Sequence, residues 1–255
     1  MMNYRTLALH ALPGIPVVKP GDDLGHLISD AIGRAGLTLA QGDVLVIAQK
    51  IVSKSEGRLI RLADVTPSAR ALELAQVVGK DPRLVELVLQ ESSEVLRYRK
   101  DVIIVEHRLG FIMANAGIDQ SNVSGDDTSA LLLPIDPDRS CKMLRQQIFE
   151  RTNTGVGVII NDSHGRAWRN GAVGVAIGAA GLPALMNLRG RPDMFGRELR
   201  ITEVGYADEL ASAASLLMGQ ADEGTPVVLI SGLPLTEQNG CATDLIRPKH
   251  MDMFR

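Results

Sequence analysis

Two carboxylates follow predicted strands in this sequence, and both are placed where they could take part in chemistry. The apolar run at 111–114 leads into a small-residue turn that contains Asp119, and the run at 156–160 leads into a polar segment that contains Asp162. Magnesium and similar hard cations bind one or two carboxylates together with substrate phosphates, and strand ends hold such oxygens rigidly. Asn, Asp and Gly also form ordinary turns after strands, so either segment alone indicates only a turn. Only the two together point towards a metal site.

Basic side chains also follow two of the predicted strands. Lys50 and Lys54 come shortly after the buried run at 44–48, and Arg166 and Arg169 follow the second carboxylate. Phosphate groups need cationic or N–H partners besides a metal ion. Taken singly, such side chains are solvated surface charges more often than ligands. Their positions after strands nevertheless fit a ligand that carries phosphate.

Several common active-site motifs are absent from the sequence. It has no GxxxxGK[ST] segment and no GxGxxG between a strand and a helix, so neither a P-loop nor a Rossmann site is expected. The five histidines form no HExxH pair, no GxSxG elbow occurs, and the two cysteines, Cys141 and Cys241, have no CxxC partner. Catalytic zinc, a hydrolase triad and a disulfide scaffold are therefore disfavoured.

The elements that must position these residues are indicated by hydrophobic periodicity and by caps. Asp22 and Asp23 precede apolar residues at three- and four-residue spacing, and Gly36 follows them, as expected for a capped amphipathic helix. Short β-branched runs indicate buried strands. The sequence thus predicts helices at 24–35, 66–78, 82–89, 137–150 and 207–218, one more helix after the glycine-rich stretch 165–181, and strands at 44–48, 102–106, 110–114, 156–160, 198–204 and 226–230.

The order of these elements indicates the fold class. Helices and strands are mixed without a regular βαβ alternation, which favours an α+β fold over a doubly wound sheet. We expect a two-lobed mixed α/β architecture. Residues 1–93 and 179–255 are expected to form a main lobe with a mixed β-sheet flanked by helices, and residues 94–178 a smaller inserted lobe that carries the metal-site loops.

The composition is that of an ordinary soluble chain. Its 255 residues are 45% hydrophobic and 22% charged, with a net charge of −3, so they can bury a substantial core. Only 3% of the residues are aromatic and basic side chains do not outnumber acidic ones, which argues against nucleic acid as a partner. The apolar runs are too short for a membrane helix, and the first residues lack a signal-peptide layout. We therefore expect a cytoplasmic protein that binds no membrane, and any nucleotide partner should be a small molecule.

Several short motifs, in the same order along nearly the whole chain, resemble those of one family, the F420-0:gamma-glutamyl ligases, also called coenzyme F420:L-glutamate ligases. Several motifs in one order are far more specific than any of them alone. The matching segments are LPGI at 12–15 with GDDL at 21–24, SKSEG at 53–57, NAGID at 115–119 with SN at 121–122, LP at 133–134 with DPD at 136–138, DSHGR at 162–166 continuing from Gly171 to Gly178, and LLMGQ at 216–220.

The resemblance implies a GTP-dependent ligase that adds L-glutamate through a γ-linkage to the deazaflavin precursor coenzyme F420-0, forming F420-1. It leaves open whether the ligase goes on to longer polyglutamate tails. A carboxylate is a poor acyl donor. The implied route therefore converts it to an acyl phosphate, with release of GDP, before the glutamate amine displaces phosphate. The implied cofactor is a divalent metal, Mg²⁺ or Mn²⁺, with two ions expected and K⁺ left open as a further ion.

The resemblance also assigns roles to individual residues. Asp119 and Asp162 are expected to bind one divalent ion and to be the catalytic residues, whereas Ser163 and Gln220 are expected to bind a second ion. Ser163 stands where the family has a threonine and keeps the hydroxyl oxygen that a metal needs. The expected GTP contacts are Leu12, Pro13, Gly14, Ile15, Gln49, Lys50, Lys54 and Asn122.

The resemblance also implies an intertwined homodimer. It further implies the stand-alone form of the ligase, without the flavin-reductase-like domain that some actinobacterial members have. Gln49 and Lys50 depart from the family, where small hydroxyl residues are expected, so the sequence leaves open whether these positions act through side chain or backbone.

Two other functions stay open. One is a metal-dependent nucleotide-using ligase or hydrolase that acts on a different phospho-carboxylate acceptor. The other is a non-catalytic nucleotide-sensing or interaction protein, which the presence of both carboxylates disfavours.

Overall fold

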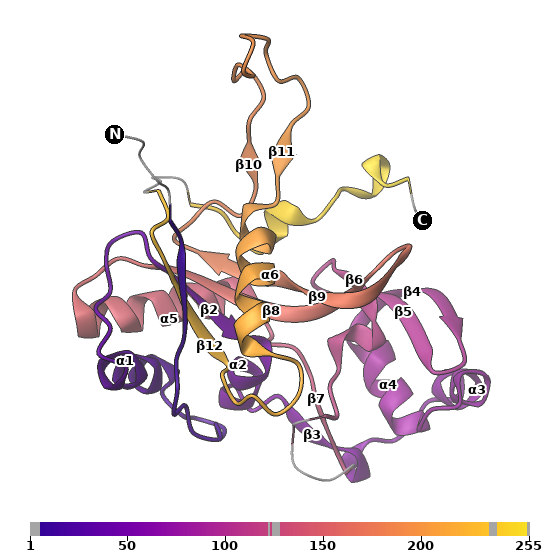
Figure 1. Cartoon of the computed structure of the whole chain (residues 1–255). Coiled ribbons are helices and arrows are strands. Elements are labelled where there is room, and N and C mark those ends of the chain that lie inside the picture. Colours follow the sequence, from indigo (N-terminus) through magenta and orange to yellow (C-terminus); the bar gives the residue numbers. More distant parts are fainter. Residues whose placement is uncertain (1–5, 122, 124–127, 235–238, 254–255) are drawn as a thin grey trace.

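A five-stranded mixed sheet forms the centre of the structure, a computed structural model that describes residues 6–121, 123, 128–234 and 239–253. β2 and β8 pair in parallel, whereas the other neighbouring strands pair antiparallel. The expected mixed sheet is therefore confirmed. Its strand order is β1 (Ala8–Ala11), β12 (Val227–Ser231), β2 (Val44–Ala48), β8 (Gly157–Arg166) and β9 (Arg169–Ala180) (Figure 1).

Helices cover both faces of this sheet, as the sequence predicts. Successive residues of a strand point to opposite faces, so Leu45 of β2 packs on one side and Val46 on the other. The first side is covered by α1 (Leu24–Arg34) and α5 (Pro137–Thr152), and the second by α6 (Tyr206–Met218). None of the helices in the described part of the chain is long and apolar enough to cross a membrane.

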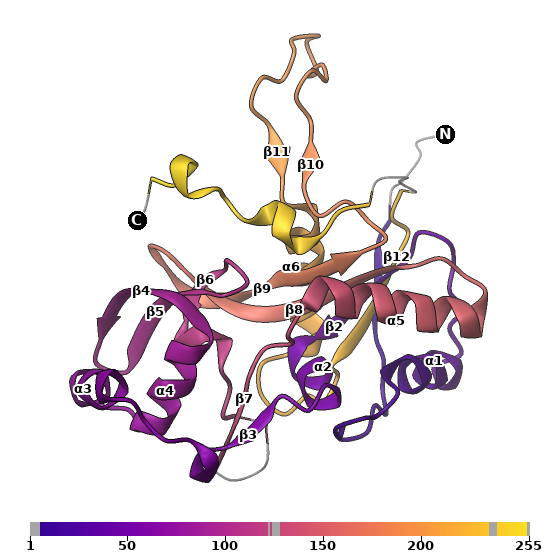
Figure 2. The same cartoon turned by 180° about the vertical axis from the view of Figure 1, so that it is seen from behind.

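A second group of elements has apolar clusters of its own. Figures 1 and 2 show its helices at the end of the molecule opposite α1. It contains the antiparallel strands β4 (Ser92–Arg99), β5 (Val102–His107) and β6 (Ile112–Ala114), the helices α3 (Ala69–Val78) and α4 (Pro82–Gln90), and the paired strands β3 (Leu59–Arg61) and β7 (Ser129–Leu131). Among the described residues, 3₁₀ turns lie at Leu62–Asp64, Asn115–Gly117, Ala242–Leu245 and Lys249–Met251.

The strand pairing differs from the inserted lobe expected at 94–178. That range includes β8 and most of β9, and both strands lie in the central sheet, with β8 directly beside β2. A short apolar run has the same sequence pattern in either sheet, so periodicity does not reveal its partner. Strands β1 and β4 were not predicted by the sequence either.

The glycine-rich stretch is an edge strand whose glycines let helices approach closely. A Cβ added at Gly174 would lie 2.6 Å from the Ala211 carbonyl oxygen of α6, and one at Gly178 would lie 2.6 Å from the Pro137 carbonyl oxygen of α5. Neither carbonyl could give way without moving its helix. These two glycines therefore serve the packing of helices on β9.

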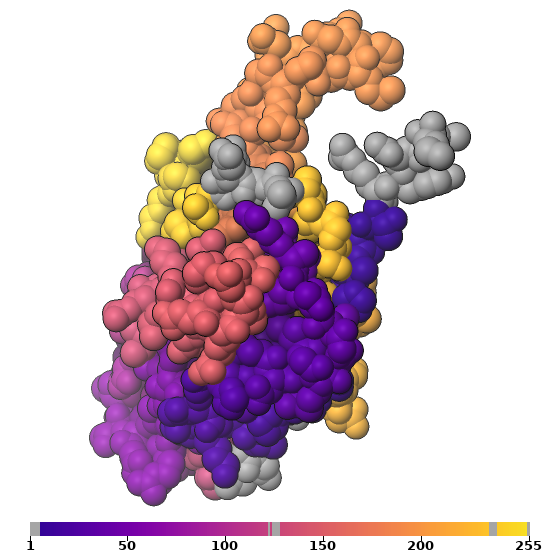
Figure 3. Space-filling model, turned by 90° about the vertical axis from the view of Figure 1, so that its left-hand side faces the viewer, coloured from indigo at the N-terminus to yellow at the C-terminus, as the bar shows by residue number. Residues whose placement is uncertain are grey.

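A long hairpin projects from the body of the molecule (Figures 1 and 3). Its base is formed by β10 (Met186–Asn187) and β11 (Glu203–Val204). The helix predicted after residue 181 is therefore wrong, and of the strand predicted at 198–204 only the last two residues pair with β10. Left-handed glycines, Gly190 and Gly196, occur within the hairpin and are incompatible with a continuing helix.

Candidate functional site

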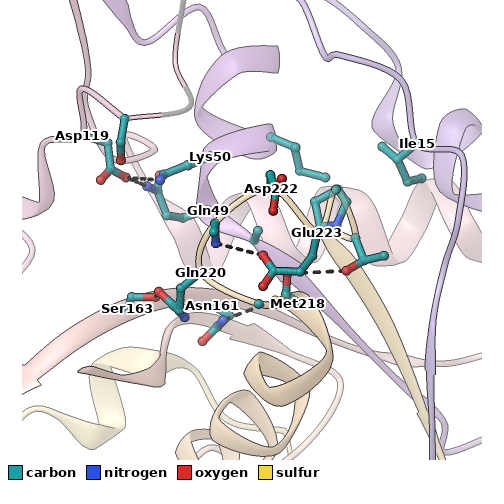
Figure 4. Close-up of a pocket in the computed structure, with 18 of the residues that line it drawn as sticks. Ile15, Gln49, Lys50, Asp119, Asn161, Ser163, Met218, Gln220, Asp222 and Glu223 are labelled. Atoms are coloured by element: carbon teal, nitrogen blue, oxygen red, sulfur yellow. Dashed lines mark hydrogen bonds and ion pairs between the residues drawn. The ribbon is translucent and has the colours of Figure 1, made fainter. Parts of the chain in front are cut away.

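A cavity of about 480 Å³ lies where β2 ends beside β8, which continues past the cavity to Arg166. This edge is where sheets with parallel strands place their ligand sites, because the carboxyl ends of such strands open together. Its walls come from the segment after β1, from α2 (Gln49–Ser55), from the turn that holds Asp119, from β8, and from the loop between α6 and β12. Figure 4 shows Ile15 on the far side of the cavity from Asp119. The sequence predicts Asp162 after a strand that ends at 160, but Asp162 lies within β8.

The Asp119 carboxylate is held by residues of α2. Its Oδ2 accepts a hydrogen bond from Gln49 Nε2 at 2.7 Å and lies 3.6 Å from Lys50 Nζ. Gln49 is buried, and its Oε1 accepts a hydrogen bond from Ser53 at 2.9 Å, which fixes the amide orientation. The Asp119 backbone pairs with Leu131 in both directions. Asp119 is thus positioned by β7 on one side and α2 on the other.

The charge state of Asp119 reflects its surroundings. Burial raises the pKa of this carboxyl to about 6; the Lys50 ammonium opposes the shift, and the Asp162 carboxylate adds to it. The two carboxylates are therefore close enough to repel each other. A bound cation would relieve this repulsion.

The other candidate metal ligands meet on β8 and on the loop after α6. Asp162 Oδ2 lies 3.3 Å from His164 Nε2, and the Ser163 hydroxyl donates to Gln220 Oε1 at 2.8 Å. All the candidate ligands offer oxygen, which suits Mg²⁺ or Mn²⁺. Within the described ranges, no three His, Cys, Asp or Glu side chains come together as a metal centre. An ion here would need hydroxyl, amide and substrate oxygens besides the carboxylates.

Lys54 adds a second ammonium group to the same wall. Burial, and next the charge of Lys50, lower the pKa of Lys54. Two lysines on one cavity wall are suited to an anion, because an anion would stabilise both ammonium groups.

The LPGI segment contributes less to the cavity than the sequence predicts. Ile15 lines it, but Leu12, Pro13 and Gly14 do not. Leu12 is fully buried and its N–H donates to the Val227 carbonyl, because this residue continues the edge of the sheet beside β12. The Gly14 carbonyl accepts a hydrogen bond from Arg34 at 3.1 Å. Asn122, another predicted GTP contact, lies outside the described residues.

The loop at 219–225 forms a wall that the sequence did not reveal beyond Gln220. Glu223 holds the loop together, because its Oε2 accepts the Ala221 N–H at 2.8 Å. Gly219, with φ +70°, ends α6 and leaves room for the Glu223 carboxyl group. Thr225 donates to the Leu217 carbonyl at 2.8 Å. Besides the LLMGQ motif, the sequence signal for this loop was a glycine directly after a predicted helix.

Taken together, the side chains around the cavity indicate a class of enzyme site. An α+β fold that brings two carboxylates, two lysines and oxygen-bearing side chains to one sheet edge is suited to a metal-assisted enzyme with phosphate-bearing substrates. The structure thus gathers eight of the twelve predicted positions, namely Ile15, Gln49, Lys50, Lys54, Asp119, Asp162, Ser163 and Gln220.

Comparison with known proteins then identifies the family. The model of the F420-0:Gamma-glutamyl ligase family matches residues 14–232, so the chain belongs to this family. It is 48% identical over 251 residues to a "Coenzyme F420:L-glutamate ligase" of Methanothermobacter thermautotrophicus, covering 98% of this chain and 99% of that one. Proteins of the same name from Methanopyrus kandleri and Methanocaldococcus jannaschii are 48% and 45% identical, covering 100% and 94% of both chains.

Proposed function

We propose that this protein uses GTP to join L-glutamate through a γ-linkage to coenzyme F420-0, giving F420-1. Family membership over nearly the whole chain supports the ligase class. The observation that carries the proposal is the convergence of Asp119, Asp162, Ser163 and Gln220 on one cavity beside Lys50 and Lys54.

The proposed reaction has two displacement steps. The acceptor carboxylate oxygen forms a bond to the γ-phosphorus of GTP while the bond to GDP breaks, which gives an acyl phosphate. The glutamate amine nitrogen then bonds to the acyl carbon, inorganic phosphate leaves with the carbon–oxygen electron pair, and the amine proton passes to solvent. No covalent enzyme nucleophile is needed.

The chain's own residues orient the reactants in this scheme. Lys50 and Lys54 hold the phosphates, and Gln49 keeps the Asp119 carboxylate aimed into the cavity. Asp119 and Asp162 would hold one divalent ion, and Ser163 and Gln220 a second. When bound, these ions would supply charge neutralisation to the transferring phosphoryl group.

We also propose that two copies of the chain form a homodimer through the projecting hairpin. Met194 and Phe195 in the hairpin are 94% and 87% exposed, and Ile201 is 84% exposed. Large apolar side chains gathered on one projection are a common mark of a protein interface.

The test of the proposed function is direct. The protein is incubated with GTP, Mg²⁺ or Mn²⁺, L-glutamate and F420-0, and the coenzyme is followed by mass spectrometry. We expect addition of glutamyl units, and Asp162→Ala should abolish it while the fold is kept. A folded protein that hydrolyses GTP without adding glutamate would favour the alternative, a nucleotide-using enzyme with a different acceptor.

A further inference from the structure

A second cavity, of about 220 Å³, has no role in the scheme above. It lies at the free edge of β9, between β6, the start of α6 and the C-terminal segment. Figure 2 shows the C-terminal segment passing over this part of β9. Its lining includes Phe111, His164, Asp208, Ile246, Arg247 and Asp252.

Nearby residues of β8 line the two cavities. Asp162 lines the first cavity and His164 lines the second, and they point to the same face because they are two residues apart on β8. His164 Nε2 lies 3.3 Å from Asp162 Oδ2, and the His164 ring packs edge-on against Phe111 with centroids 6.5 Å apart. A group bound beside His164 is therefore one side chain away from the candidate metal ligands.

The C-terminal segment is fixed over the second cavity at both ends. The Ala242 N–H donates to Asp138 Oδ1 at 2.8 Å, and Lys249 Nζ lies 2.8 Å from Glu106 Oε2 and 3.2 Å from Glu94 Oε2. Between these anchors Ile246 packs on Gly110, where an added Cβ would lie 3.0 Å from Ile246 Cδ1. The cavity is thus built by defined contacts.

The second cavity offers charges of both signs. Asp208 lies in the first turn of α6, and its Oδ1 accepts the Ala176 N–H of β9 at 2.9 Å. Burial raises the pKa of Asp208, the Ala176 hydrogen bond opposes the shift, and the nearby His164 also opposes it. A ligand ammonium would stabilise this carboxylate. Arg247 and Asp252 also line the cavity, and both already take part in interactions. The Arg247 guanidinium has five N–H donors, so it can bind a ligand carboxylate as well.

We propose that this second cavity binds the amino-acid substrate, with Asp208 contacting the ammonium group and Arg247 a carboxylate. This inference rests on the proposed function, which requires an amino acid beside the activated acceptor. The volume of the second cavity, about 220 Å³, suits a ligand as small as an amino acid. Pockets for drug-sized ligands measure roughly 300–1,000 Å³. Asp208 and His164 line the same cavity, and His164 contacts Asp162 of the first cavity, so an amine held by Asp208 would lie towards the candidate metal ligands.

The test compares charge-removing variants in the full-length protein. Asp208→Asn keeps an oxygen for the Ala176 N–H and removes only the charge, and Arg247→Gln removes the guanidinium. We expect each to raise the KM for L-glutamate by about tenfold or more, as for loss of a charge-assisted hydrogen bond, with the KM for GTP unchanged. Glu209→Gln, an exposed neighbour on the same turn of α6, is the matched control and should change neither constant.

Glutarate, which has both carboxylates of glutamate but no amine, separates the two roles. Asp208→Asn should leave inhibition by glutarate unchanged, whereas Arg247→Gln should weaken it by about the same factor as glutamate binding. Thermal unfolding of each variant checks that it is folded. If one of the two variants fails to fold, the KM of the other for L-glutamate still tests the proposed site.

The outcomes distinguish this inference from the proposed function. Wild-type ligation with an unchanged glutamate KM in the folded variants would overturn the second cavity as the amino-acid site and leave the proposed function standing. Absence of ligation in the wild type would overturn the proposed function. Equilibrium dialysis of labelled L-glutamate then tests the second cavity directly. We expect Asp208→Asn to retain less L-glutamate than the wild type, and equal retention by the two proteins would contradict binding in this cavity.

Discussion

At the scale of single residues, Gln49 is the side chain that connects most of the site. It donates to Asp119 and accepts from Ser53, so its amide is held at both ends although it is buried. Lys50, the next residue, reaches the same carboxylate. These two side chains therefore act on Asp119, whatever further contact they make with a nucleotide.

We expect Gln49→Ala to lower glutamyl addition by about tenfold and to destabilise the fold by about 1–3 kcal/mol, because it leaves buried polar groups without a partner. Activity assays and urea denaturation measure the two effects. Gln146→Ala, at an exposed position on α5, is the control and should behave as wild type. Normal activity of Gln49→Ala would show that Asp119 needs no partner from α2.

Gly219 should tolerate no side chain. With φ +70° and ψ −173° its backbone is restricted to glycine, and an added Cβ would overlap the Glu223 carboxyl group. We expect Gly219→Ala to displace the loop and weaken nucleotide affinity by about tenfold, measured by calorimetry. Gly224→Ala is the matched comparison, since it has a similar φ of +67° but a nearest neighbour at 3.9 Å, and its effect should be clearly smaller.

At the scale of elements, Glu91 joins α4 to its surroundings. It is 6% exposed, forms ion pairs with Arg58 and Arg108, and lies 3.6 Å from His107 Nε2. Arg58 also donates to the Leu133 carbonyl at 2.8 Å. One carboxylate thus connects the end of α4, the β5–β6 turn and the segment before β3.

This cluster predicts a loss of stability in acid. Burial alone would raise the pKa of Glu91, but His107, Arg108 and Arg58 outweigh it and lower the pKa from 4.5 to about 2. Its stabilisation is therefore complete above about pH 4.5 and is lost as the pH falls towards 2. A shift of this size corresponds to about 3 kcal/mol, measured as the free energy of unfolding against pH.

Glu91→Gln should lose about 3 kcal/mol at pH 7 and show a flatter stability profile as the pH falls from about 4.5 to 2. Glu73→Gln, at an exposed position on α3, should keep the wild-type profile. If Glu91→Gln also kept that profile, the cluster would not be the source of the acid sensitivity.

At the scale of the whole molecule, the projecting hairpin is the feature least suited to an isolated chain. Its apolar side chains at 194, 195 and 201 face solvent, and a two-stranded ribbon of this length has little to pack against (Figure 3). A second copy of the chain would cover it.

We expect sedimentation to give a dimer at micromolar concentration, and Phe195→Asp to shift it towards the single chain, because a charge at an apolar interface is left without a partner. Tyr98→Asp changes another exposed aromatic residue, outside the hairpin, and should leave the dimer intact. A lone 27 kDa species in the wild type would contradict the homodimer.

Much of the local structure is predictable from this sequence. Asp23 caps α1 and Asp81 caps α4, and the strands at 44–48 and 226–230 agree with β2 and β12 to within one residue. These elements carry their signals locally, in caps and in apolar periodicity. β9 was missed because its glycines, needed for close helix packing, remove the usual strand pattern.

The sequence by itself determined the capped helices, the buried strands and the family, and with them the residue types that the site can use. The tertiary structure alone decided which of those residues meet. It places Gln49 against Asp119, 70 positions away, and Ser163 against Gln220, 57 positions away, and it leaves Leu12 in the core. Such contacts depend on which strands pair and in what register, and pairing between distant segments leaves no periodic mark in the chain.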